Sequence, residues 1–220
     1  MKILKSSTEI KNREPIFPQD SVEMENYVNL VRSLFKKHMP SNYVITEDNA
    51  KIISTVFEHL LKLPHFNQHG IIKNKASLNK GILIFGPVGT GKTLLFEIIK
   101  NVGSDLIQMG NKDFWLTHVS SNSFSEKYRE SLKQTDSTFS FEKYFTGKLY
   151  IDDLGTEEPL YRNNDPIQRL LLERYIAKSL TFATTNLTPP ELAERYGERI
   201  GDRLPEMFNI LKYEGESLRH

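Results

Sequence analysis

The chain contains no cysteine among its 220 residues. This absence excludes disulfide bonds, sites in which thiolates bind a metal, and cysteine nucleophiles. A chain without cysteine fits a reducing compartment, and we expect a cytoplasmic protein.

The sequence also lacks long apolar runs and a strong charge of either sign. No apolar stretch approaches the length of a membrane span, and residues 1–19 are polar and charged. They predict a disordered arm rather than a signal peptide or a membrane anchor. The formal net charge is only +1, so contact with nucleic acid requires a local basic patch. With 38% hydrophobic residues, the chain can bury the core of one domain.

Hydrophobic periodicity predicts a helical extension over residues 20–80, with helices at 20–39 and 47–62, and Thr46 is the candidate cap of the second helix. Beyond this extension, short apolar runs alternate with helical patterns. The predicted strands are 81–85, 114–119, 149–151 and 180–184, and the predicted helices are 92–102, 123–132 and 166–179. This alternation indicates an α/β fold with a parallel sheet flanked by helices, in which ligands bind at the carboxyl ends of the strands. The expected buried stripe of the last helix consists of Ile167, Leu170, Leu171 and Ile176.

A glycine-rich segment follows the first predicted strand. The segment "GPVGTGKT", residues 86–93, matches the pattern G-x-x-x-x-G-K-[ST] between a strand and a helix. Its glycines let backbone N–H groups surround phosphate oxygens at the positive end of the helix. Lys92 is expected to reach the β- and γ-phosphates, and the Thr93 hydroxyl to ligate Mg²⁺. The expected ATP-binding residues are Gly86, Pro87, Val88, Gly89, Thr90, Gly91, Lys92, Thr93 and Leu94.

The segment "KLYIDDLGTEE", residues 148–158, is an apolar strand that ends in carboxylates. An acid at the end of a neighbouring strand holds Mg²⁺ in P-loop proteins, and we assign that role to Asp152. Asp153 is the candidate for orienting the attacking water, with Glu157 as its rival. The alternative for Asp153 is a residue that only caps the strand end. Glu158 is expected to be a solvated loop acid.

Five segments carry a resemblance to a known family: "GILIFGPVGTGKTLL", "LYIDDLGTEE", "FATTNLTPPEL", "ERYGERIGDRL" and "GESLR". Their order and spacing resemble the DnaC/DnaI-type helicase-loader ATPases. These form a branch of the AAA+ superfamily close to DnaA and to the IstB-type transposition ATPases. The resemblance implies an AAA+ ATPase core over residues 81–220, whereas residues 1–80 match no such pattern.

The resemblance implies a sensor role for Asn186 in "ATTN", in contact with the γ-phosphate or the attacking water. The residues alone are compatible with a simple turn, because Thr188 and Glu191 form a helix-capping box directly after it. The resemblance also places Arg219, in "GESLR", where a second sensor arginine approaches the nucleotide.

Arg199 and Arg203 lie four residues apart in "YGERIGDRL", on one face of a short predicted helix. The resemblance implies that this segment offers an arginine finger to the ATP of a neighbouring subunit. Arg203 fits that position better than Arg199. Spacing alone favours two surface arginines paired with Glu198 and Asp202.

The resemblance further implies how the protein assembles and what it binds. Most AAA+ proteins carry a helical lid after the core, whereas this sequence and the loaders lack most of it. We therefore expect an oligomer with nucleotide at its subunit interfaces, and slow hydrolysis by monomers. The implied protein partner is a hexameric replicative helicase, for which the two N-terminal helices are the candidate binding module.

Contact with single-stranded DNA is implied by the same resemblance. Residues 123–133 and 159–165 mix aromatic and basic side chains, the combination that stacks bases and follows a phosphate backbone. The alternative is an ordinary surface helix and loop. The candidates are Phe124, Lys127, Tyr128, Arg129, Tyr161 and Arg162.

Three functions are compatible with these patterns. The first is a helicase-loader ATPase that contacts single-stranded DNA. The second is an IstB-type ATPase that assembles on duplex DNA and recruits a transposase. The third is a P-loop kinase for a small metabolite, which leaves "ATTN" and the arginine pair without a role.

Overall fold

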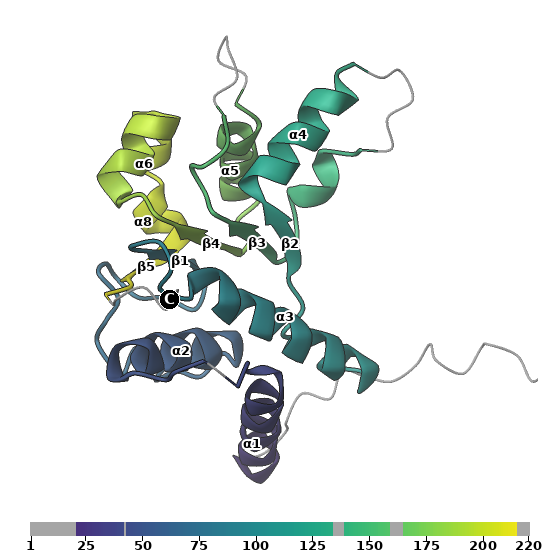
Figure 1. The fold of residues 1–220 in the computed structure, drawn as a ribbon, viewed down its shortest axis with the longest axis vertical. Coiled ribbons are helices and arrows are strands. Elements are labelled where there is room, and N and C mark those ends of the chain that lie inside the picture. Colours follow the sequence, from purple (N-terminus) through teal and green to yellow (C-terminus); the bar gives the residue numbers. More distant parts are fainter. Residues whose placement is uncertain (1–20, 42, 134–138, 159–164, 215–220) are drawn as a thin grey trace, which may run out of the picture.

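The computed structural model describes residues 21–41, 43–133, 139–158 and 165–214. Its centre is a five-stranded sheet in which every neighbouring pair of strands is parallel (Figure 1). The order across the sheet is β2–β3–β4–β1–β5. The strands are β1 (Gly81–Phe85), β2 (Thr117–Ser120), β3 (Leu149–Asp152), β4 (Thr181–Thr185) and β5 (Phe208–Lys212). The predicted α/β fold with a parallel sheet is confirmed.

Helices cover both faces of the sheet (Figure 1). One layer holds α1 (Ser21–His38), α2 (Glu47–Leu60) and α3 (Lys92–Gln108). The other holds α4 (Ser121–Ser131), α5 (Pro166–Ile176), α6 (Pro189–Tyr196), α7 (Glu198–Gly201) and α8 (Leu204–Met207), with a 3-10 turn at Glu142–Tyr144. Side chains alternate along β1, so that Ile82 and Ile84 pack with the first layer and Leu83 with the second.

The predicted N-terminal extension packs against the sheet layer. Val31 and Phe35 of α1 and Val56 of α2 belong to the same buried cluster as Ile82 of β1. The predicted cap of α2 is also present, because the Thr46 side chain accepts from the N–H of Asn49 in a capping box. Residues 21–80 therefore share one hydrophobic core with β1 and α3.

Several predicted boundaries differ from the structure. The helix after β1 continues to Gln108 rather than ending near residue 102. The strand expected at 114–119 is shorter and later, since Phe114 and Leu116 are core residues that precede β2. Sequence reasoning missed β5 altogether. The predicted burial of Ile176 is wrong: α5 ends there and the side chain is 66% exposed.

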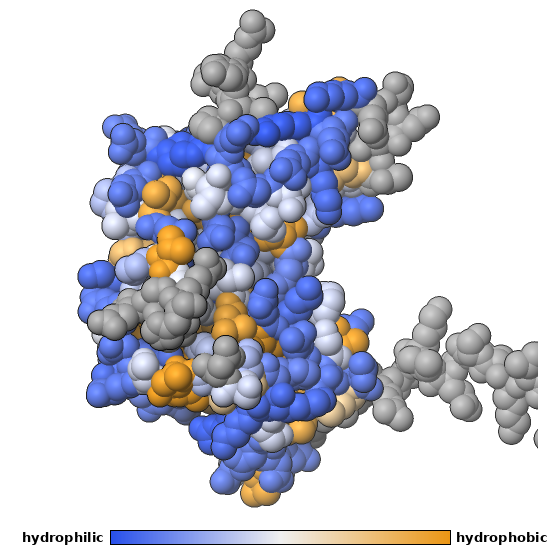
Figure 2. All heavy atoms as spheres, viewed as in Figure 1, coloured by the Kyte–Doolittle hydropathy of each residue, from blue (hydrophilic) through white to orange (hydrophobic). Residues whose placement is uncertain are grey.

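The described helices include none that is long and apolar enough to cross a membrane. Hydrophilic side chains predominate on the face shown in Figure 2, with hydrophobic side chains in small separate patches. This distribution is the ordinary one for the surface of a folded domain.

One buried amide ties β5 to the loop that enters β1. Asn209 is 0% exposed, and its Nδ2 donates to the carbonyl oxygens of Ser77 at 2.8 Å and Gly81 at 3.0 Å. Its Oδ1 accepts from the N–H of Ser77 at 2.8 Å. We predict that Asn209→Ala lowers the free energy of unfolding by about 2–4 kcal/mol, because it leaves buried backbone groups without partners.

Urea-induced unfolding measures this change. Asn79→Ala is the matched control, because the exposed Asn79 lies in the same loop, and it should shift stability by no more than about 0.5 kcal/mol. Equal effects of the two substitutions would show that the Asn209 amide does not hold β5.

Candidate functional site

The glycine-rich loop connects the end of β1 to the start of α3. Gly89 and Gly91 adopt left-handed φ angles of 87° and 93°, which favour glycine. A Cβ atom on Gly86 would lie 2.4 Å from the carbonyl oxygen of Tyr213, so the loop also needs glycine there for space. Gly91 caps α3 without a side-chain hydrogen bond. The first N–H groups of this long helix therefore have no competing side-chain acceptor from the cap residue.

The ammonium group of Lys92 lies inside this loop. Lys92 is buried, and its Nζ donates to the carbonyl oxygens of Gly86 at 2.9 Å and Pro87 at 2.6 Å. It also donates to Oδ1 of Asn186 at 3.0 Å. Asn186 directly follows β4, the strand paired with β1, so sheet order brings it to the loop. The structure thus joins two residues that the sequence separates widely.

Asp152, at the end of β3, meets the first turn of α3. The Thr93 hydroxyl donates to Oδ1 of Asp152 at 2.9 Å. The same oxygen accepts from the hydroxyls of Tyr150 at 2.6 Å and Thr184 at 2.7 Å. Burial raises the pKa of Tyr150 well above its usual value, and the Asp152 charge raises it further. Tyr150 therefore remains a hydrogen-bond donor at neutral pH.

The expectation that β3 is a direct neighbour of β1 is wrong, because β4 lies between them. The inserted strand contributes Thr184 to the Asp152 carboxylate and presents Asn186 next to Lys92. A sequence does not state strand order, so this bridging role of β4 could not be predicted. Thr93 and Asp152, the two residues expected to hold Mg²⁺, are nevertheless hydrogen-bonded to each other.

Asp153 turns the chain away from the strand. Its φ is 51°, a left-handed value that is uncommon outside glycine and best tolerated by Asn and Asp. Its carbonyl oxygen accepts from the hydroxyls of Ser121 at 2.7 Å and Thr156 at 2.8 Å. The backbone of Asp153 is therefore held at the carboxyl end of the sheet by a helix start and by its own loop.

Glu157, the rival of Asp153, is occupied elsewhere. Its side chain is buried, and Oε1 accepts from the Tyr196 hydroxyl at 2.6 Å and from Arg195 at 3.0 Å. Oε2 accepts from the N–H of Gly155 at 3.1 Å. Burial and the Glu157 charge raise the pKa of Tyr196, so its hydroxyl remains a donor. Through these hydrogen bonds, Glu157 connects the turn after Asp153 to α6.

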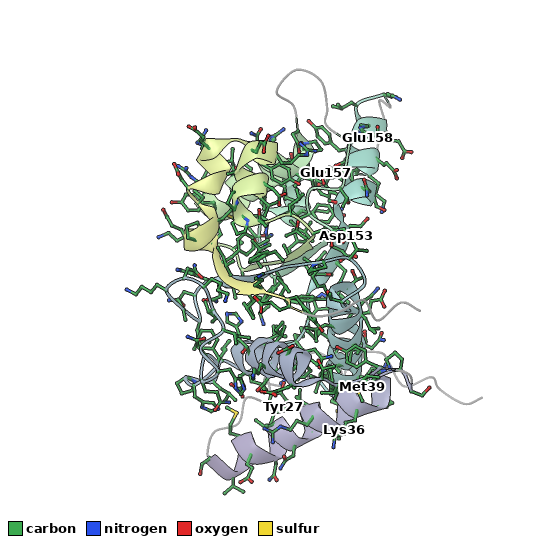
Figure 3. The ribbon with its side chains drawn as sticks, turned by 60° about the vertical axis from the view of Figure 1, so that its left-hand side comes forward. Tyr27, Lys36, Met39, Asp153, Glu157 and Glu158 are labelled. Carbon is green, nitrogen blue, oxygen red and sulfur yellow. The ribbon has the colours of Figure 1, made fainter. Side chains whose placement is uncertain are left out.

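The carboxylates after β3 follow one another away from the sheet (Figure 3). Asp153 is next to the strand end, Glu157 lies beyond it, and Glu158 is farthest from α1, which carries Lys36. The Glu158 side chain is 87% exposed, as expected for a solvated loop acid. Of these three acids, Asp153 alone combines closeness to the Asp152 carboxylate with a partly exposed position.

The arginine pair does not share one helix, which corrects the prediction. The helix breaks after Gly201, and Arg203 precedes α8. The Arg203 guanidinium donates to the carbonyl oxygen of Arg199 at 2.8 Å and lies 5.0 Å from the ring centroid of Tyr175 in α5. Phe208, shortly after α8, pairs with Gly81 at the start of β1, whereas Lys92 follows the end of β1. Arg203 is therefore at the opposite edge of the sheet from Lys92 of its own chain.

The expected base-stacking role of Phe124 and Tyr128 is wrong. Both side chains are buried in the core, where Phe124 packs against Phe141 and Tyr144. Lys127 is exposed on α4, whereas Arg129 donates to the carbonyl oxygen of Glu158. The arm at 1–19 and the candidates Tyr161, Arg162 and Arg219 lie outside the described residues.

The chemistry of the site fits a nucleoside triphosphate and Mg²⁺. Within the described ranges, no cluster of three or more His, Cys, Asp or Glu side chains could hold a metal ion unaided. Mg²⁺ in phosphate sites needs only one or two carboxylates, since water and phosphate oxygens supply the other ligands. The Thr93 hydroxyl beside Asp152, with the Lys92 ammonium nearby, supplies that combination.

Sequence reasoning missed four residues that complete the site: Tyr150, Thr184, Arg195 and Tyr196. A signal existed for Tyr150, which lies two positions before Asp152 and therefore points to the same face of β3. No comparable signal existed for Arg195 and Tyr196, whose contact with Glu157 spans 38 and 39 residues of sequence.

A parallel sheet with the phosphate loop after β1 and an acid at the end of β3 defines the class: an α/β P-loop fold. No protein-family model matches the chain, and no curated protein matches it in sequence. Solved structures do match. DnaI is 20% identical with a TM-score of 0.55, over 87% of this chain and 93% of that one. The DnaC helicase loader is 17% identical with a TM-score of 0.55, over 82% and 98%.

A third similar structure is the replication initiator DnaA bound to AMPPCP and single-stranded DNA. It is 18% identical with a TM-score of 0.53, over 83% of this chain and 52% of that one. The chain thus spans about half the length of DnaA. At these identities the likeness shows a shared fold, which this chain has in common with the DnaI, DnaC and DnaA structures.

The Glu157 network predicts a stability effect that is separate from catalysis. Glu157→Gln removes the charge from a buried acceptor of Arg195 and Tyr196, so it should lower the free energy of unfolding by about 2–4 kcal/mol. Glu158→Gln is the control, because the same substitution at the exposed neighbour should cost no more than about 0.5 kcal/mol. Denaturant unfolding compares them, and an unchanged stability of Glu157→Gln would contradict the structural role.

Proposed function

We propose that the protein binds and hydrolyses ATP with Mg²⁺ and acts in DNA replication as a loader of a hexameric helicase, in contact with single-stranded DNA. The observation that carries the ATPase proposal is the meeting of the Lys92 ammonium with Asn186, and of the Thr93 hydroxyl with Asp152. Three separate strand ends supply these groups, which a P-loop ATPase needs at one place.

ATP would be held by the backbone of residues 86–94 and by Lys92, and Mg²⁺ by Thr93 and Asp152. The metal ion, when bound, neutralises charge on the phosphate oxygens. The Lys92 side chain supplies a second positive charge from a rigid loop. Asn186 limits where the ammonium can lie and offers an amide toward the same position.

Asp153 is the proposed residue that orients the attacking water. Its support is positional, because it follows Asp152 at the strand end and its backbone is fixed by Ser121 and Thr156. The competing carboxylate of Glu157 already receives donors from Gly155, Arg195 and Tyr196. A shorter aspartate holds water less closely than a glutamate, so we expect slow turnover.

An arginine finger acting between subunits is supported by the place of Arg203. It contacts Tyr175 at the amino edge of the sheet, so that it cannot serve the nucleotide of its own chain without a large rearrangement. We propose that Arg203 completes the site of a neighbouring subunit in an oligomer, with Arg199 as the second candidate.

The helicase-loader proposal rests on the extent of the structural likeness. The similarity to DnaI and the DnaC helicase loader includes most of this chain and more than nine-tenths of theirs. The proposed contact with single-stranded DNA draws on the DnaA complex, whose bound ligands include such a strand. Exposed Lys127 is the described basic residue that remains available for this contact.

The proposed chemistry predicts two different defects. Asp153→Asn should retain ATP binding and lower hydrolysis at least about 100-fold, because general-base assistance contributes this much. Asp152→Ala should remove the dependence of binding on Mg²⁺. Phosphate release and a fluorescent ATP analogue measure the two properties. Normal hydrolysis by Asp153→Asn, with loss in a folded Glu157→Gln variant, would reverse the assignment.

The proposed finger predicts complementation between variants. Arg203→Ala and Lys92→Ala should each be inactive alone, since one lacks the finger and the other its own nucleotide site. Their mixture should recover part of the activity, because a Lys92→Ala subunit still offers Arg203 to its neighbour. Arg199→Ala tests the second candidate, and it should retain activity if Arg203 is the finger. A mixture without activity, from variants that still assemble, would exclude the trans role.

The replication role is tested by capture of partners from the native host, with the protein held in ATP by Asp153→Asn and compared with its nucleotide-free form. Mass spectrometry should identify a hexameric replicative helicase that is enriched in the ATP form. Enrichment of a transposase in its place would overturn the loader proposal while leaving the ATPase proposal intact.

A further inference from the structure

A cavity lies at the opposite edge of the sheet from the phosphate loop. Its volume is about 1010 Å³. Four of its lining residues directly precede strands: Lys80 before β1, Lys148 before β3, Leu180 before β4 and Met207 before β5. The ends of α2 and α5 close its sides. We call this cavity the basal groove; it lies at the amino ends of the strands, whereas the nucleotide site lies at their carboxyl ends.

The charges around the basal groove are strongly unequal. Among the described residues, Glu206 is the one acid in its lining, and its carboxylate accepts a hydrogen bond from the Tyr175 hydroxyl at 2.7 Å. Burial lowers the pKa of Lys148, as expected for a cation held in a partly enclosed space. The cationic side chains of the lining are Lys62, Lys80, Lys148, Arg174 and Lys178.

Arg174 is a buried charge whose partners are neutral. It is 0% exposed, and its guanidinium donates to the Thr181 hydroxyl at 2.8 Å and to the carbonyl oxygens of Gly147 at 2.6 Å and Leu180 at 2.8 Å. Among the described residues, no carboxylate lies within ion-pair distance of it. Burial lowers its pKa to about 10, so it stays charged at neutral pH. Its hydrogen bonds are satisfied, while its charge still favours an anion in the adjoining groove.

Two lysines occupy backbone positions that normally favour glycine. Lys62 and Lys178 have left-handed φ angles of 56° and 50°, each one residue beyond the cap of α2 or α5. Asp153, at the nucleotide site, is the other non-glycine residue with positive φ in the described ranges. A lysine at such a position costs stability that glycine would not. Both lysines line the basal groove, so both positive charges act on the same space.

The basal groove also has an apolar component. Ile176 is 66% exposed at the end of α5, and Leu60, Leu78, Leu180 and Met207 line the same space. The aromatic residues offer little surface for stacking, because Phe182 is 0% exposed and the Arg203 guanidinium occupies one face of the Tyr175 ring. The groove therefore offers cations and aliphatic surface together.

We propose that the basal groove binds an acidic segment of a partner protein, in which carboxylates alternate with aliphatic side chains. Lysines on flexible stems suit dispersed carboxylates, and the aliphatic residues suit their apolar neighbours. The negative C-terminal ends of α2 and α5 oppose any anion here, and they oppose a doubly charged phosphate group more strongly than a single carboxylate. A single nucleic-acid strand is also disfavoured, because the described residues of the groove offer no well-exposed aromatic side chain on which its bases could stack.

The proposal is tested with the full chain and a fluorescein-labelled dodecapeptide of repeated Glu-Leu-Glu-Ser, read by fluorescence anisotropy. The double variant Lys62→Asn/Lys178→Asn removes two charges and keeps the fold, because asparagine tolerates left-handed backbone. It should bind the peptide about tenfold more weakly, with a reduced dependence on salt. Lys62→Arg/Lys178→Arg should retain binding. Lys36→Gln, which removes one exposed positive charge on α1, is the control for charge loss outside the groove and should also retain binding. ATP binding should be unchanged in all three.

Absence of saturable binding, equal binding by the double asparagine variant, or equal binding of a peptide with glutamine in place of glutamate would overturn the proposal. Binding of oligo(dT) or pyrophosphate that is lost in the double variant would assign the groove to phosphate-bearing ligands instead. Self-association lost in that variant would make the groove a contact between copies of this chain, which also overturns it.

Discussion

The Asp152 carboxylate is the contact on which the arrangement of the carboxyl edge depends. One of its oxygens receives hydroxyl groups from β3 itself, from β4 and from the first turn of α3. Since α3 begins at the phosphate loop, this carboxylate fixes the loop relative to the sheet. β4 passes between the two and contributes Asn186 to the Lys92 ammonium. Loop, acid and amide are therefore positioned by the same three strand ends.

The two edges of the sheet have different chemistry. The carboxyl edge combines a glycine loop, one ammonium and an acid that is held by neutral donors. The amino edge combines several cations with aliphatic surface and ends in Arg203 stacked on Tyr175. An oligomer would set an arginine of one chain beside the nucleotide of the next, so that assembly and hydrolysis become coupled. The network of Glu157, Arg195 and Tyr196 provides a rigid link between the loop after Asp153 and the helices that precede Arg203.

The sequence could predict the phosphate loop, the Thr46 cap of α2 and the parallel sheet, because each depends on neighbours in sequence. Thr46 needs only Asn49 nearby, and "GPVGTGKT" needs only a strand before it and a helix after it. Strand order, the missed β5 and the burial of Phe124 depend on contacts between distant segments. Ile176 shows the same limit: its helical spacing matches a buried stripe, but the helix ends there and exposes it. The sequence favoured Asp153 but left Glu157 as its rival, because the donors that occupy the Glu157 carboxylate are brought to it only by the fold.

The central claim is that the Lys92 loop is a nucleotide site, and calorimetric titration with ATP tests it most directly. The account predicts one binding site per chain that is strengthened by Mg²⁺ and lost in Lys92→Ala, while the folded fraction of that variant by circular dichroism stays unchanged. Absence of binding by the wild-type protein, or equal binding by a folded Lys92→Ala variant, would contradict it.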